Sequence, residues 1–168
     1  QMVTEQNERL SKLVRTLLDM SELQTVMRND RIELHSLIEE VLTDLEPLAQ
    51  EKKVELIQKS QGAGEKADEE LFLTGSDILI YRMLYNLVEI AIKYNRENGS
   101  VTVSAIRKKN EVVLTVSDTG NGIDEAFRKQ IFEPFFRIDK SRSRELGGVG
   151  LGLAIVREIV RVHDGTIE

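Results

Sequence analysis

Three glycines at alternate positions, in the run Gly-Val-Gly-Leu-Gly-Leu at residues 148–153, lead directly into an apolar segment at residues 154–160. The apolar segment predicts a buried helix. Glycine lets a backbone approach a ligand closely, and the amides at a helix N-terminus attract anions. The run is therefore typical of a phosphate-binding loop. Taken alone, it is explained at least as well by a flexible loop in front of an ordinary buried helix.

Length and charge limit the classes of protein to which the chain can belong. Its 168 residues, 40% of them hydrophobic, suffice for one α/β core and an additional element. The net charge of -6 argues against nucleic acid and anionic membrane surfaces as partners, so a phosphate would have to be held locally. The absence of cysteine excludes a disulfide framework and is compatible with a reducing cytoplasm. We expect a cytoplasmic segment that binds no nucleic acid.

Residues 1–29 predict one long helix with a heptad repeat of apolar side chains. The repeat positions hold Val3, Leu10, Leu13, Leu17, Met20 and Met27. Such a stripe can pack on the chain's own core or on a second helix of a bundle. We favour the bundle because the heptads continue without a break, which is typical of coiled coils and helical bundles.

Residues 30–168 predict an α/β domain in which short strands alternate with amphipathic helices. The expected strands cover residues 31–35, 54–58, 71–75, 101–106 and 112–117. The expected helices cover residues 37–48, 77–94 and 154–160. We expect Ser36 to cap the first of these helices, with Glu39 completing a capping box.

Asp118 stands at the end of the last expected strand, in front of a turn that contains Gly120 and Gly122. A carboxylate in this position is a strong hydrogen-bond acceptor at the mouth of a pocket with little side-chain bulk, which suits the amino edge of a purine. The alternative is a turn selected for its backbone conformation, with Asp118 capping a helix that starts near Asp124.

Four motifs, taken in order along the chain, resemble the N, first glycine, F and second glycine boxes of bacterial sensor histidine kinases. They are residues 86–94 (Asn-Leu-Val-Glu-Ile-Ala-Ile-Lys-Tyr), Asp118-x-Gly120-x-Gly122, Phe132-x-Pro134-Phe135-Phe136-Arg137 and Gly148-x-Gly150-Leu151-Gly152-Leu153. These kinases share the ATP-binding fold of gyrase, Hsp90 and MutL-type ATPases. The resemblance covers nearly the whole chain, since the first helix is similar to the second helix of the kinase dimerisation bundle.

The resemblance implies a two-layer α/β sandwich, with helices packed on one face of a mixed β-sheet, preceded by a long bundle-type helix. Residues 1–29 would be the second helix of the dimerisation and phosphoacceptor bundle, through which we expect a homodimer. Residues 30–168 would be the ATP-binding catalytic domain. The family continues past residues 165–168 with the rest of that strand and one more. We therefore expect truncated C-terminal strands and a sheet that lacks an edge strand or is completed by a second copy.

The resemblance also implies an ATP site formed by residues of all four motifs. Asp118 would accept a hydrogen bond from the adenine amino group, Tyr94 would flank the ring, and Gly120 and Gly122 would shape the adenine pocket. The residues implied at the phosphates are Lys93, Arg137, Gly148, Gly150, Gly152 and Leu153, and Phe135 and Leu151 belong to the same ATP-binding set. Asn86 would lie near the phosphates and the Mg²⁺ ion, as a weak candidate for a metal ligand.

One departure from the family concerns the metal. The N box of the family has a second asparagine four residues after Asn86, which is the main protein ligand of Mg²⁺, and this chain has Ile90 there. Isoleucine offers the metal no oxygen, so we expect Mg²⁺ binding and the use of Mg-ATP to be impaired.

A second departure concerns the phosphoacceptor. The family places its histidine in the first bundle helix, followed by a characteristic acidic and Thr-Pro motif, and neither His35 nor His163 has that context. We expect both to be structural or surface histidines, with no catalytic residue in this chain.

The resemblance therefore implies the ATP-binding catalytic portion of a two-component sensor histidine kinase, which presents the γ-phosphate of ATP to a histidine elsewhere. The parent protein would be a membrane-bound sensor that passes the phosphoryl group to a response regulator, and this chain alone would not phosphorylate itself. The alternative is a catalytically inactive nucleotide-sensing or interaction module, favoured by Ile90. An ATP-driven clamp fits less well, because hydrolysing relatives have glutamate at the position of Asn86.

Overall fold

The computed structural model describes residues 7–8, 10–11, 14, 22–59, 70–123, 125–128, 130–132 and 152–168. The chain divides into two compact units. One unit is Met27–Gly122, and the other combines Gln1–Val26 with Ile123–Glu168. Among the described residues, no helix combines the length and the apolar character needed to cross a bilayer.

The unit Met27–Gly122 contains a mixed β-sheet. Its strands are β2 (Glu55–Gln58), β4 (Ser100–Lys108) and β5 (Glu111–Asp118). Strand β4 pairs in parallel with β2 and antiparallel with β5, so it lies between them. A second, antiparallel pair consists of β1 (Asp30–Glu33) and β3 (Phe72–Gly75). The mixed sheet expected from the sequence is thus confirmed.

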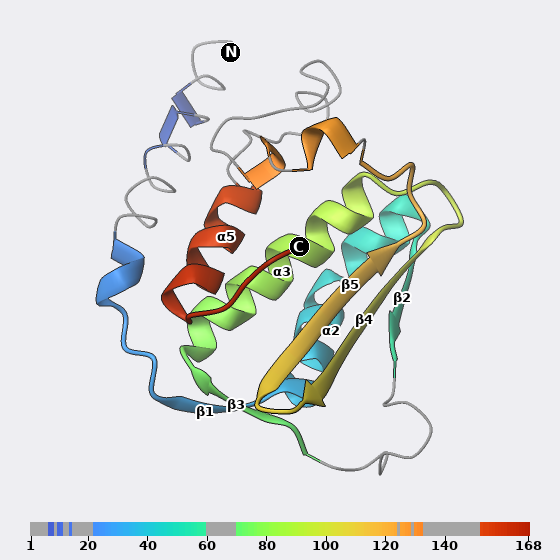
Figure 1. Ribbon diagram of the computed structural model, residues 1–168. Helices are drawn as coiled ribbons and strands as arrows, with labels where there is room; N and C mark the ends of the chain where they lie inside the picture. Colours follow the sequence, from blue (N-terminus) through green and yellow to red (C-terminus); the bar gives the residue numbers. More distant parts are fainter. Residues whose placement is uncertain are drawn as a thin grey trace. The chain divides into compact units, whose positions relative to one another are not determined.

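Two helices, α2 (Leu34–Lys52) and α3 (Asp77–Lys93), cover one face of this sheet (Figure 1). Side chains of β4 alternate between the buried and the partly exposed face, as expected for a strand with one covered face. The buried face of β4 consists of Val101, Val103 and Ala105. Fully buried helix residues such as Leu84 and Val88 complete the core. The two-layer α/β arrangement is confirmed for this unit.

The start of α2 differs from the sequence prediction. The helix begins at Leu34, and Glu33 is its N-cap, accepting a hydrogen bond from the Ser36 amide at 3.1 Å. A carboxylate at this position both satisfies an unpaired amide and interacts favourably with the helix dipole. The predicted cap at Ser36 and the capping box with Glu39 were therefore wrong. His35 lies in the first turn of the helix instead of in a strand.

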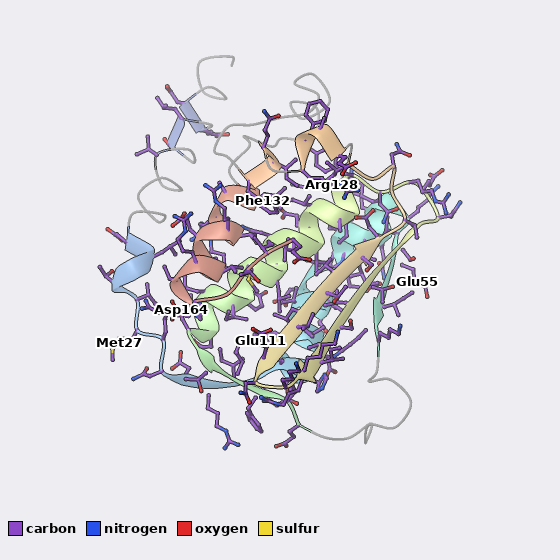
Figure 2. The ribbon with its side chains drawn as sticks, in the orientation of Figure 1. Met27, Glu55, Glu111, Arg128, Phe132 and Asp164 are labelled. Atoms are coloured by element: carbon purple, nitrogen blue, oxygen red, sulfur yellow. The ribbon has the colours of Figure 1, made fainter. Side chains whose placement is uncertain are left out.

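Strands β4 and β5 form a hairpin whose connection is Lys109-Asn110, and Lys109 adopts a positive φ of 56°. Figure 2 labels Glu111 at the start of β5. Asp118 ends the same strand at its other end. The hairpin predicted from the sequence is confirmed.

In its described residues, the second unit contains the helix α5 (Gly152–Val162) and three short 3-10 helices. These are η1 (Leu23–Thr25), η2 (Glu125–Phe127) and η3 (Gln130–Phe132). The apolar side of α5 is buried through Ala154, Ile155, Val156 and Ile159. Helix α5 lies against η1 and η3, and Leu23 of η1 is itself buried.

The long N-terminal helix falls mostly outside the described residues. Positions 7, 8, 10, 11 and 14 are helical, and Leu10 and Val14 are exposed. The prediction that the helix runs to residue 29 was wrong, because η1 and an extended Val26 (φ −72°, ψ 132°) replace its end. Thr25 donates a hydrogen bond to the carbonyl of Glu22, and such side-chain bonds to the backbone compete with a regular helix.

Candidate functional site

Helix α3 presents Asn86, Ile90 and Lys93 on one side. Residues three and four apart are neighbours on a helix surface, so these three follow one another along α3. All three side chains are half-buried, whereas Leu84, Val88 and Ala91 face the core. The amphipathic sequence of α3 thus fixes which side chains remain accessible.

The turn after β5 is held by the carboxylate of Asp118. Its Oδ1 atom accepts a hydrogen bond from the Gly120 amide at 2.8 Å. This is the local side-chain-to-backbone bond through which aspartate forms a tight turn. The side chain is exposed, and the described residues provide no partner for the second oxygen, Oδ2. One acceptor atom therefore forms the turn, and no described residue occupies the other.

Gly120 brings this turn against the end of α3. A Cβ atom at position 120 would lie 2.8 Å from the Tyr94 carbonyl oxygen and 3.0 Å from Asp118 Oδ1, which is too close for a side chain. Tyr94 is the C-cap of α3 and is 38% exposed. Gly122 has a positive φ of 73°, a conformation that glycine adopts readily. The structure thus brings Tyr94, Asp118 and Gly120 together.

A small polar network, which sequence reasoning missed, fixes the same junction. Thr119 Oγ1 accepts a hydrogen bond from the Ser100 amide at 2.9 Å and donates one to Asn95 Oδ1 at 3.0 Å. Asn95 Nδ2 donates to the Ser100 carbonyl at 2.9 Å. Gly99 leaves room for this network, since a Cβ there would lie 2.3 Å from Asn95 Oδ1. The one sequence signal was Asn95 directly after the predicted helix, which also fits an ordinary helix end.

The remaining predicted residues belong to the other unit or lie outside the described residues. Gly152 and Leu153 begin α5 in the other unit. The other residues implied at the phosphates or in the ATP-binding set lie outside the described residues, namely Phe135, Arg137, Gly148, Gly150 and Leu151. The part of the predicted site that the structure brings together is therefore Tyr94 with the Asp118 turn, while Asn86 and Lys93 lie on α3, of which Tyr94 is the C-cap.

The described residues offer few ligands for a divalent metal. They contain no group of three histidine, cysteine, aspartate or glutamate side chains that could hold an ion. On this side of α3, Asn86 provides one amide oxygen, Ile90 provides none, and the Glu89 carboxylate is paired with Lys93 at 3.5 Å. This donor set does not fit the oxygen-rich shell that Mg²⁺ prefers.

The structure also describes both histidines and a surface hollow. His163 Nδ1 lies 2.8 Å from the Ile159 carbonyl at the end of α5, which is a local helix contact. His35 lies in the first turn of α2. A hollow of about 390 Å³ is lined by Ala49, Gln50, Lys53, Val54, Glu55, Asn98 and Gly99, none of which the sequence had assigned to a site.

Comparison with known proteins gives concordant matches. The family described as histidine kinase-, DNA gyrase B-, and HSP90-like ATPase matches residues 75–168. The sensor histidine kinase RppB of Synechocystis sp. is 32% identical over 168 residues, covering 98% of this chain and 36% of RppB. The chain spans about a third of the length of the curated relatives it matches.

Two solved structures are similar over most of the chain. Histidine kinase ThkA in complex with the response regulator TrrA has a TM-score of 0.74 and 26% identity, covering 98% of this chain and 43% of ThkA. Full-length ShkA in complex with AMPPNP has a TM-score of 0.75 and 25% identity, covering 94% of this chain and 32% of ShkA.

Proposed function

This chain belongs to the histidine kinase-, DNA gyrase B- and HSP90-like ATPase family, and we propose that it is the ATP-binding catalytic portion of a two-component sensor histidine kinase. The observation that supports this most directly is the Asp118 turn packed against the end of α3 through Gly120. The turn combines an exposed carboxylate, a backbone with little side-chain bulk and the neighbouring Tyr94 backbone.

In this proposal Asp118 recognises adenine. Its Oδ2 atom accepts a hydrogen bond from the exocyclic amino group, while Oδ1 keeps the Gly120 amide. Tyr94 flanks the base, since an exposed aromatic ring can stack on a purine. ShkA was solved with the ATP analogue AMPPNP, which supports a nucleotide as the ligand of this fold.

The proposed chemistry is phosphoryl transfer to a histidine on a bundle helix outside this chain. Catalysis of such a transfer consists mainly of positioning the phosphates and neutralising their charge. Lys93 and Asn86 would contribute here. His35 and His163 lie in α2 and after α5, so we assign neither of them as phosphoacceptor. The chain alone should not phosphorylate itself.

The whole protein would act in a two-component pathway. ThkA was solved in complex with a response regulator, which supports a response regulator as the partner of the parent protein. We further propose that residues 1–29 belong to a dimerisation bundle, since Leu10 and Val14 are exposed apolar residues of the heptad stripe. The parent would be a membrane-bound sensor with this segment in the cytoplasm.

Mg²⁺ handling is the point at which the chain departs from its family. Mg²⁺ in such sites is held by protein oxygens together with the nucleotide phosphates, and the described residues supply the Asn86 amide and no acidic cluster. Ile90, half-buried beside it, adds a hydrocarbon surface. We therefore propose that the site binds Mg-ATP weakly. This observation also favours the second candidate function, a catalytically inactive module that senses a nucleotide.

Replacing Asp118 with asparagine tests the adenine assignment. Asp118→Asn substitutes an NH₂ donor for one acceptor oxygen and removes the charge. Loss of a hydrogen bond to a charged group costs about 1.5–3 kcal/mol, so affinity for ADP should fall about tenfold or more in a calorimetric titration. Glu111→Gln, which removes one charge at the other end of β5, should leave the affinity unchanged. Equal affinities for Asp118→Asn and the parent chain would disprove the adenine assignment.

A further inference from the structure

We infer that Glu89 lowers the affinity of this site for nucleotide phosphates by competing for Lys93. The inference rests on the proposed nucleotide site and adds a residue that the sequence motifs had not singled out. A change in the Glu89–Lys93 ion pair should alter the affinity for nucleotide phosphates and leave adenine recognition unchanged.

Glu89 and Lys93 form an ion pair one helical turn apart. The Lys93 Nζ and Glu89 Oε1 atoms lie 3.5 Å apart, and the two side chains are 28% and 30% exposed. By contrast, the pair between Lys53 and Glu97 is 66% and 65% exposed. Water and salt screen a sheltered pair less than an exposed one, so the Glu89–Lys93 attraction is the stronger candidate for an energetic effect.

The position of the pair connects it to the site. Glu89 and Lys93 follow Asn86 at spacings of three and seven residues, which places them on the same side of α3. Lys93 directly precedes Tyr94, and the Tyr94 carbonyl oxygen lies close to Gly120 of the Asp118 turn. A nucleotide whose base is held at Asp118 would therefore place its phosphates within the electrostatic reach of this pair.

The competition follows from charge. Phosphates need positive charge to balance them. Ile90 stands where the family has its Mg²⁺-ligating asparagine, so this position offers no ligand to a metal ion that could supply such charge. Lys93 must then contribute more of that charge, but in the structure Glu89 already neutralises it. A phosphate has to displace the Glu89 carboxylate from Lys93 before it can use the ammonium group fully. Removing the Glu89 charge should therefore strengthen phosphate binding through Lys93.

Calorimetric titrations of ATP and adenosine in EDTA, using the full chain, test this competition. Glu89→Gln should strengthen ATP binding about twofold to fivefold, the scale of one surface ion pair, and should leave adenosine binding unchanged. Lys93→Gln should weaken ATP binding. In the Lys93→Gln background, Glu89→Gln should lose most of its benefit, because there is no ammonium group left to release.

Glu97→Gln is the matched control, since it removes the same charge from the exposed pair with Lys53. It should leave ATP binding unchanged. An equal gain from Glu89→Gln with and without Lys93, or an equal gain from Glu97→Gln, would overturn the competition and leave only general charge repulsion. If the parent chain binds neither ATP nor adenosine, the proposed function fails, and this inference fails with it. Adenosine binding with no Glu89→Gln effect on ATP rejects the inference alone.

Discussion

Gly120 is the residue on which the geometry of the candidate site depends most. The Asp118-Gly120 pattern could be predicted from the sequence because a carboxylate and glycines in one short turn are a local feature. The network of Asn95 and Thr119 could not, because its hydrogen bonds join residues 24 positions apart in the chain. Such a contact depends on the register of β4 and β5 and on where α3 ends, and no short pattern encodes either one.

Replacing Gly120 with alanine should disrupt the junction. The new Cβ would lie 2.8 Å from a backbone oxygen, which cannot move without displacing the end of α3. We expect the free energy of unfolding to fall by about 1–3 kcal/mol and ADP affinity to fall with it, as urea unfolding and calorimetry would show. Gly122→Asn is the control for stability, since an added Cβ there meets no atom of the described residues within 4 Å and asparagine tolerates a positive φ. Similar losses of unfolding free energy in both variants would contradict the steric account.

At the scale of elements, hydrophobic periodicity predicted the type and order of helices and strands in Met27–Gly122, while some boundaries shifted. The segment Ile32-Glu33-Leu34 alternates like a strand, yet Leu34 also begins the apolar stripe of α2 that continues at Leu37 and Ile38. Over so few residues, the two-residue period of a strand and the 3.6-residue period of a helix fit the sequence equally well, so sequence alone could not separate them. In the folded chain, Glu33 is the N-cap, so the strand ends there and the helix begins at Leu34.

Helices α2 and α3 are joined by Tyr81, whose hydroxyl donates a hydrogen bond to Asp44. Burial, followed by the Asp44 carboxylate, raises the pKa of Tyr81 from 10.0 to about 12. Burial also raises the pKa of Tyr85. The unfolded chain therefore loses these protons at lower pH than the folded chain, and the stabilisation present below pH 10 should disappear as the pH rises to about 12.

Urea unfolding at a series of pH values from 9 to 12 would measure this loss. Tyr81→Phe should remove part of the pH dependence, because phenylalanine has no proton to lose. Tyr94→Phe, at the opposite end of α3, should retain the Tyr81 contribution. A free energy of unfolding that responds to alkaline pH equally in the parent chain and in Tyr81→Phe would contradict the assignment.

At the scale of the whole molecule, the sequence motifs predicted the family, and the match over residues 75–168 confirms it. One half of the predicted site, from Asn86 to Gly122, lies in the unit Met27–Gly122. The other half belongs to the motifs at residues 132–137 and 148–153, most of which lie outside the described residues. The order of the motifs predicts one ligand site for all four, but spacing along a chain does not determine where residues of two units lie in space.

The most direct test of the central claim is a calorimetric titration of ATP into this chain and into Ile90→Asn, each with and without Mg²⁺. We predict that the parent chain binds ATP with the same modest affinity in both conditions. Ile90→Asn should gain a Mg²⁺-dependent increase, because the amide restores an oxygen ligand beside Asn86. Failure of both proteins to bind ATP under either condition would contradict the assignment of this chain as a nucleotide-binding kinase domain.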